Sequence, residues 1–299
     1  MTEMTSPPVA INPPAPGSGP GLATQLRRMS YRLAVKVVPG LAGRIAADAF
    51  GRSRAKGSRT QFRMPLGAVS FEISGNQDVR RGFIWRNQGP TVLLVHGWGS
   101  DSSSMLGLVK PLLALGFQVA AFDAPAHGES PGNQTTMSRF VAAVASVIAT
   151  LGKVEVMIGH SLGSIAAVAA LSRAEPHLAQ TVRRLVLIAA PSSLVTVLES
   201  WAANQQLPAP IKDKVYQRLL LQNGVPVSHW DICVLGRGFD LPILVVHDED
   251  DRVVPICEAK KLAQELQNVS LQQTSGLGHS RILSAAAVKQ MICTFITQT

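Results

Sequence analysis

One serine in this sequence has the surroundings that nucleophilic catalysis requires. The segment Gly159–Gly163 reads Gly-His-Ser-Leu-Gly, follows an apolar run and precedes an alanine-rich stretch. A serine in a G-x-S-x-G pattern between a strand and a helix sits on a sharp turn that exposes its hydroxyl, and the glycines let neighbouring chain pass closely. We therefore predict Ser161 as a nucleophile. The alternative is an ordinary glycine-rich turn between a strand and a helix.

Acyl transfer also needs N–H donors aimed at the oxygen that gains negative charge. The N–H of Leu162, directly after the serine, is one predicted donor. The apolar run Val92–Val95 ends in His-Gly-Trp-Gly at 96–99, and the N–H of Trp98 is the second predicted donor. Alternatively, Trp98 is a wall of the pocket. His96 is interpreted as a structural histidine.

Two later loops provide a base and an acid. His279 lies in Gly-Leu-Gly-His-Ser at 276–280, and a histidine on a glycine-flanked loop can reach a distant serine. Four consecutive acidic residues, at 248–251, follow the apolar run Ile243–Val246, so the residues alone leave the choice of acid open. The chain order of serine, acid and histidine is that of α/β-hydrolases and differs from other serine-protease folds.

Alternating strands and helices are expected to position these loops. Short apolar runs suit parallel strands that are covered on both faces: Val92–Val95, Gln118–Phe122, Val154–Ile158, Leu185–Ala189, Ile243–Val246 and Val269–Gln273. Ala68–Ile73 and Val79–Trp85 are predicted as an antiparallel pair. The predicted helices are Met137–Leu151, Leu162–Ala174, Ile256–Gln267 and one from about Ser280 to Thr297. This alternation predicts an α/β fold with a mostly parallel, doubly wound sheet.

Residues 191–240 interrupt the alternation and are predicted to form a small helical lid on the main domain, which spans residues 64–299. A connection this long usually carries its own structure. Two helical stretches, Val195–Asn204 and Ile211–Leu221, are expected within it. Its apolar side chains are predicted to cover an acyl pocket, or alternatively to form the lid's own core: Leu194, Val195, Leu198, Trp201, Leu219 and Leu220.

The basic charge belongs to the N-terminal part of the chain. Residues 1–63 carry ten basic and two acidic residues, whereas residues 64–299 carry eighteen and seventeen. The near-neutral main domain argues against a nucleic-acid partner. Residues 1–21 are predicted to be a disordered, proline-rich tail. Residues 22–63 are predicted to be a basic helical extension, divided at Pro39, that packs on the main domain; contact with an anionic membrane surface or a weak export signal are the alternatives.

Residues 67–299 resemble the α/β-hydrolase superfamily, within it the bacterial esterase-like branch. The matching motifs are HGWG at 96–99, DAPAHGES at 123–130, GHSLG at 159–163, HDEDDRVVP at 247–255 and GLGHS at 276–280. The resemblance implies an α/β-hydrolase fold with Ser161 as nucleophile, His279 as base and Asp251 as acid, because family members place the acid two residues before Val-Val-Pro. Asp250 is the fallback. The resemblance also implies chemistry without a metal or organic cofactor.

The expected activity is hydrolysis of a small-molecule ester or thioester with a small to medium hydrophobic group, through an acyl-enzyme. Three scattered cysteines, Cys233, Cys257 and Cys293, are expected to be reduced thiols in a cytoplasmic protein. Acyl transfer to another alcohol, perhydrolysis and carbon–carbon bond hydrolysis are alternatives on the same fold. A non-catalytic binding protein is the alternative of another class.

Overall fold

The computed structural model of the chain describes residues 38–53 and 67–298. Its strands are β1 Val69–Phe71, β2 Gly82–Trp85, β3 Thr91–Val95, β4 Gln118–Phe122, β5 Val156–His160, β6 Arg184–Ile188, β7 Ile243–Asp248 and β8 Val269–Thr274. They form one sheet in the order β1-β2-β4-β3-β5-β6-β7-β8. β2 runs antiparallel to both β1 and β4, and the remaining neighbours are parallel. The predicted α/β-hydrolase fold, with its mostly parallel sheet, is confirmed.

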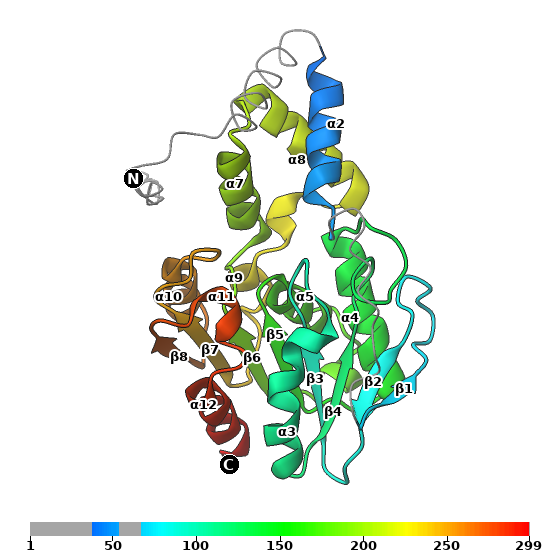
Figure 1. Cartoon of the computed structure of the whole chain (residues 1–299), viewed down its shortest axis with the longest axis vertical. Coiled ribbons are helices and arrows are strands. Elements are labelled where there is room, and N and C mark those ends of the chain that lie inside the picture. Colours follow the sequence, from blue (N-terminus) through cyan, green and yellow to red (C-terminus); the bar gives the residue numbers. More distant parts are fainter. Residues whose placement is uncertain (1–37, 54–66, 299) are drawn as a thin grey trace.

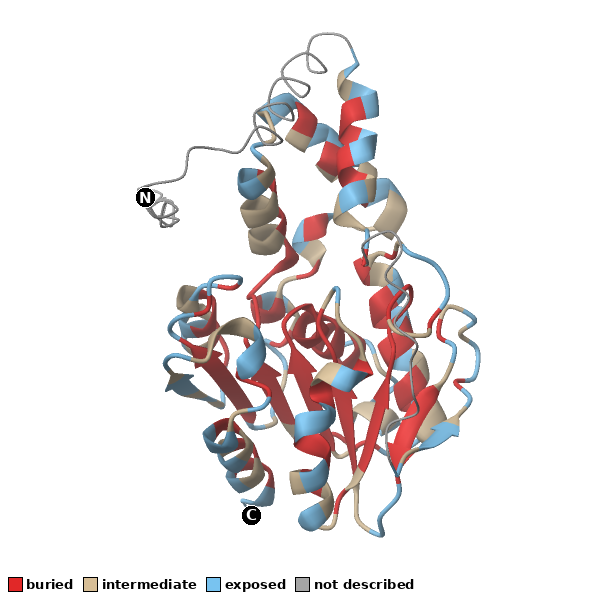
Figure 2. Ribbon diagram, in the orientation of Figure 1, coloured by how far each residue is buried: buried red, intermediate tan, exposed pale blue. Residues whose placement is uncertain are grey.

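Helices cover both faces of the sheet (Figure 1). One face carries α3 (Leu106–Ala114) and α12 (Ala286–Thr297), whose apolar residues share a core with alternate side chains of the strands. The other face carries α4 (Met137–Leu151), α5 (Leu162–Leu171) and α10 (Ile256–Glu265). Shorter elements are η1 (Ser102–Met105), α6 (Pro176–Ala179) and α11 (Gly278–Arg281). Figure 2 shows that the central strands are buried by these layers.

The chain signals its own element boundaries in several places. Helix α4 begins after Thr136, whose side chain accepts a hydrogen bond from the N–H of Arg139, and ends at Gly152 with a positive φ of 71°. Such caps satisfy backbone groups that have no partner within the helix. The strands β3 and β5 are buried at every position, as their uninterrupted apolar runs predict.

The final predicted helix is wrong as a single element. The structure divides it into α11, which carries His279, and α12, because Ala285 adopts an extended backbone with ψ 131°. Ile282 and Leu283 lie between the two helices and are buried against the core beneath α3. Tertiary packing of these two side chains overrides the helical periodicity of the sequence. The break allows α11 to orient its histidine independently of α12.

The lid, residues 191–240, lies beyond the carboxyl ends of the central strands (Figure 1). It contains α7 (Leu194–Gln205), α8 (Ala209–Asn223), η2 (Val227–His229) and α9 (Ile232–Leu235). Helix α2 (Pro39–Phe50), which begins at the proline predicted to divide the extension, packs along α8. Their approach is close, because a Cβ on Gly43 would lie 2.2 Å from the Cβ of Lys214. The rest of the N-terminal prediction, at 1–37 and 54–63, lies outside the described residues.

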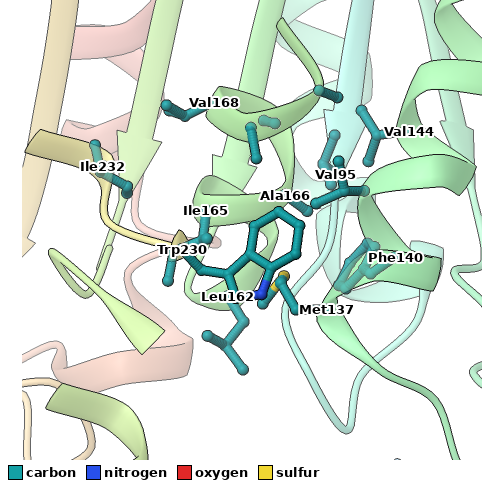
Figure 3. Packing of buried hydrophobic residues seen from close by; sticks show 14 of the residues in the cluster. Val95, Met137, Phe140, Val144, Leu162, Ile165, Ala166, Val168, Trp230 and Ile232 are labelled. Carbon is teal, nitrogen blue, oxygen red and sulfur yellow. The ribbon is translucent and has the colours of Figure 1, made fainter. Parts of the chain in front are cut away.

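Most of the apolar lid side chains pack in the hydrophobic core that they share with one face of the sheet, and none of them lines the cavity described below. Leu194, Leu198 and Leu219 are buried in this core, and Leu220 is exposed. Trp230, at the base of the lid, is fully buried and lies beside Leu162 and Ile165 of α5 (Figure 3). The lid is thereby anchored to the helix that follows Ser161. Within the described ranges, no helix has both the length and the apolar composition to cross a membrane.

Candidate active site

Ser161 occupies a strained turn between β5 and α5. Its backbone has φ 52° and ψ −129°, a conformation that costs a non-glycine residue on the order of 1–3 kcal/mol. The two glycines of the motif are required by space: a Cβ on Gly159 would lie 2.7 Å from Ser164 Cα, and one on Gly163 would lie 2.3 Å from the His96 carbonyl oxygen. The N–H of Ser161 donates to the carbonyl of Ile188 on β6, at 2.9 Å. The close packing at the two glycines and the hydrogen bond to β6 therefore both fix the backbone of this turn.

Asp251 and His279, which are distant along the chain, meet beyond the carboxyl end of β7. The Nδ1–H of His279 donates to Asp251 Oδ2 at 2.7 Å. The other carboxylate oxygen accepts from the N–H groups of Val253 and Val254, at 2.8 and 2.9 Å. Burial opposes ionisation of Asp251, but these bonds, the one from His279 foremost, outweigh it and hold the pKa of Asp251 below its ordinary value.

His247 fixes the loop that carries Asp251. Its ring is fully buried, and its Nε2–H donates to the carbonyl of Val254 at 2.8 Å. The same nitrogen lies 3.5 Å from Asp251 Oδ2. Burial lowers the pKa of His247, which favours a neutral ring beside the Asp251 carboxylate.

Asp248 and Asp250 hold the backbone on the N-terminal side of His279. Asp248 Oδ1 accepts from the N–H of Gly278 at 2.8 Å, and its Oδ2 accepts from the N–H of Leu277 at 3.1 Å. Asp250 Oδ2 accepts from the N–H of Gly276 at 2.8 Å. The structure therefore brings Asp251 to the imidazole, while the carboxylate of Asp250, the fallback acid, accepts from the N–H of Gly276 and the hydroxyl of Ser275 in that loop.

Ser161 and His279 line one cavity of about 370 Å³. Its wall is made of loops at the carboxyl ends of the strands and is rich in small and polar residues: Gly97, Trp98, Gly99, Ser100, Ser104, His160, Ser161, His279, Ser280 and Leu283. Trp98 lies in this wall, as one of the two sequence interpretations expected, and its indole N–H donates to the carbonyl of Arg52 at 3.0 Å. The cavity is at the small end of the range for small-molecule sites.

The two predicted oxyanion donors lie beside this cavity. Leu162 is the first residue of α5, where backbone N–H groups lack acceptors within the helix. Within the described part of the chain, the backbone N–H of neither Leu162 nor Trp98 donates a hydrogen bond. The next N–H, that of Gly99, is taken by His127 Nε2 at 3.0 Å. Two donors are therefore available near Ser161.

Comparison with known families agrees with this architecture. The family described as "alpha/beta hydrolase fold" matches residues 90–228, and the family described as "TAP-like protein" matches residues 227–299. Together the two matches cover every predicted site residue. The chain belongs to the α/β-hydrolase superfamily.

The relatives of this α/β-hydrolase include proteins named as haloperoxidases and a protein named as an esterase. It is 25% identical to a non-heme haloperoxidase from Rhodococcus erythropolis, over 70% of this chain and 92% of the relative. It is also 25% identical to a pimeloyl-(acyl-carrier protein) methyl ester esterase from Aromatoleum aromaticum, over 65% of this chain and 93% of the relative. An esterase structure from Pyrococcus furiosus shares the fold, with a TM-score of 0.61 and 20% identity over 82% of this chain and 96% of that one.

Sequence reasoning missed the residues of the α/β-hydrolase that support the predicted triad. His160 is the residue before Ser161, and its Nε2–H donates to the carbonyl of His279 at 2.9 Å. His247 and Asp248 are, in the sequence, two of several polar residues that follow one apolar run, and the structure places both at the end of β7. Their spacing in the sequence does not distinguish a residue that supports the triad from a solvated loop residue. Their contacts depend on how segments that are separate in the sequence meet in the fold.

Proposed function

We propose that this α/β-hydrolase is a serine hydrolase that cleaves a carboxylic ester or thioester. The observation that carries the proposal is the convergence of three residues: Asp251 accepts a hydrogen bond from His279 Nδ1, and His279 and Ser161 line the same cavity. A histidine whose Nδ1–H is held by a carboxylate has its Nε2 free to act as a base. The esterase and haloperoxidase names of the relatives support acyl chemistry.

In the proposed mechanism, His279 Nε2 takes the proton of the Ser161 hydroxyl as Oγ attacks the substrate carbonyl carbon. The N–H groups of Trp98 and Leu162 stabilise the negative oxygen of the tetrahedral intermediate. The imidazolium then protonates the leaving alcohol or thiol as its bond to carbon breaks. A water molecule, deprotonated by His279, attacks the acyl-enzyme and releases the acid, and Ser161 regains its proton.

The cavity favours a short acyl group. Its volume of about 370 Å³ must hold both the acyl group and the leaving group, and its wall is dominated by glycine, serine and histidine. The apolar lid residues that would solvate a long chain pack mostly in the core shared with the sheet and do not line this cavity. Of the small to medium hydrophobic groups expected from the sequence, the cavity therefore favours the small ones.

A p-nitrophenyl ester series tests this proposal. We expect kcat/KM to be highest for acetate or butyrate and to fall at least about tenfold by decanoate. Burial of a methylene against an apolar wall would contribute roughly 0.8 kcal/mol, but this cavity offers no such wall to a long chain. The additional methylenes instead meet the steric limits of the cavity. Acyl-CoA thioesters of the same lengths form a second arm. A rise in kcat/KM up to decanoate would contradict the proposed pocket.

Two alternatives have distinct signatures. The haloperoxidase name of one relative favours perhydrolysis as the second candidate, in which hydrogen peroxide replaces water and releases a peracid from the same acyl-enzyme. Peracid formation that exceeds hydrolysis in the presence of peroxide would favour it. A non-catalytic binding protein would leave the chain unlabelled by a fluorophosphonate probe.

A separate proposal concerns the outer face of α2, which we infer to contact an anionic lipid surface. Its small residues, Ala42, Gly43, Ala46 and Ala47, are buried, whereas Val38, Leu41 and Ile45 are 45%, 53% and 57% exposed. The same face carries the Arg44–Asp48 ion pair, so it presents half-exposed apolar side chains beside charged groups, as helices that lie at a lipid surface do. Three side chains are too few for a stable protein interface. The four basic residues just before α2, Arg27, Arg28, Arg32 and Lys36, provide the charge that anionic lipid attracts.

Vesicle co-sedimentation tests this contact. We expect the full chain to sediment with phosphatidylglycerol vesicles and far less with phosphatidylcholine vesicles. The double substitution Leu41→Ser with Ile45→Ser should weaken binding to the vesicles about 30-fold, since two half-exposed side chains lose roughly 2 kcal/mol of burial in lipid. The control is Leu221→Ser, which removes a side chain that is 77% exposed on α8. Unchanged sedimentation of the double variant would exclude the role of α2.

A further inference from the structure

For the imidazole of His279 to reach Ser161, the position of its backbone must be fixed as well as the orientation of its ring. Gly276 and Gly278 both have positive φ, 81° and 65°, and Ser275, Gly276 and Ser280 are exposed. The amides of Leu277 and Gly278 are held by Asp248, as described above. On the other side of the histidine, the carbonyl of residue 279 accepts from the side chain of His160.

His160 is built into the nucleophile turn, directly before Ser161. The residue is 5% exposed, and the centroid of its ring lies 4.9 Å from that of His279 at an interplanar angle of 45°. The Nε2···O distance to the His279 carbonyl is 2.9 Å. This contact therefore joins the backbone of the predicted nucleophile to that of the predicted base without passing through Asp251.

The protonation of His160 follows from its surroundings. Burial, and next the neighbouring His279, lower the pKa of His160 to about 4, so the ring is neutral near pH 7 and carries one N–H. A carbonyl can only accept, so that hydrogen is on Nε2. Nδ1 has no hydrogen-bond partner among the described residues and faces Gly97, where a Cβ would come within 3.1 Å of it. The contact with His279 is thus the one hydrogen bond that the ring makes within the described chain.

We propose that His160 is a positioning residue, which sets the distance between Ser161 and the His279 imidazole by holding the His279 carbonyl. The inference rests on the proposed serine hydrolase. The proposal assigns this positioning to the Nε2–H donor of His160 and not to the imidazole ring as a whole. A glutamine can present its amide N–H₂ where Nε2 lies, whereas the shorter asparagine reaches only as far as Nδ1.

Kinetics of His160→Gln and His160→Asn in the full chain test the assignment. We expect His160→Asn to lower kcat about 10- to 100-fold with KM changed by less than about twofold, because a displaced base weakens the chemical step more than substrate binding. His160→Gln should retain kcat to within about threefold. His160→Leu is a second variant without the donor, and its apolar side chain suits the buried position if the asparagine variant does not fold. The control is His177→Asn, which removes an exposed histidine.

A second measurement does not depend on turnover. The proton between His279 Nδ1 and Asp251 gives a downfield NMR resonance when the imidazole is held. We expect this resonance in the wild type and in His160→Gln, and its loss or broadening in His160→Asn and His160→Leu. Wild-type kcat and an intact resonance in the two donor-free variants would overturn the proposal, and so would equal impairment of His160→Gln and His160→Asn. If the wild type hydrolyses no ester, the proposed function fails, and the resonance alone still decides whether His160 positions the imidazole.

Discussion

Replacing Ser161 by alanine is expected to lower kcat for the preferred p-nitrophenyl ester by roughly 10⁵- to 10⁶-fold. Without Oγ no acyl-enzyme can form, and only the oxyanion donors and substrate binding remain. The free energy of unfolding should hardly change, because the Ser161 side chain makes no capping hydrogen bond to α5. Steady-state kinetics and thermal unfolding measure the two effects.

The matched control for this substitution is Ser164→Ala, three residues along the same helix. The Ser164 hydroxyl is fully buried and has no hydrogen-bond partner among the described residues, so its removal should leave kcat within about twofold. A fluorophosphonate probe should label the wild type and Ser164→Ala but not Ser161→Ala. Residual hydrolysis by Ser161→Ala above about one percent, in protein free of contaminating esterase, would contradict the assignment of the nucleophile.

Replacing Asp251 by asparagine is expected to lower kcat by about 10⁴-fold. The oxygen that accepts from Val253 and Val254 should remain in place, which turns the amide N–H₂ toward His279. Nδ1 would then have to accept a hydrogen bond, so the ring proton would move to Nε2. That tautomer cannot take the proton of Ser161, although its position is nearly unchanged.

Asp250→Asn separates the two possible acids. Asp250 is exposed and accepts from the Ser275 hydroxyl at 3.0 Å and from the N–H of Gly276 at 2.8 Å, so its loss should loosen the loop and lower kcat only a few-fold. Parallel kcat measurements on the two variants decide between them. Equal losses, or a larger loss in Asp250→Asn, would mean that the acid has been assigned to the wrong residue.

The fold could be predicted from the sequence because its signals are local. Strands buried on both faces need continuous apolar runs, and Thr136 and Gly152 mark the ends of α4. The final helix was predicted as continuous because Ile282 and Leu283 fit a helical period. Only the packing of these two residues beneath α3 shows that the chain must turn there.

The site was less predictable because its contacts join distant segments. Four consecutive carboxylates offer the same chemistry, and only the path of the loop directs Asp248 and Asp250 to backbone amides and Asp251 to the imidazole. The bond between His160 and the carbonyl of His279 spans 119 positions along the chain and leaves no pattern in composition or spacing. The size of the cavity likewise depends on where the lid packs.

The attachment of α2 determines where this protein can be shortened. Residues 51–53 continue from α2 into the rim of the cavity: the carbonyl of Gly51 accepts from the N–H of Thr135, and that of Arg52 accepts from the indole of Trp98. A fragment that starts after residue 53 would expose the side of α8 that Gly43 now covers and would leave the Trp98 indole without its acceptor. We therefore expect a fragment that starts upstream of Pro39 to be more stable than one that starts after residue 53, although α2 lies well outside the segment that the family matches cover.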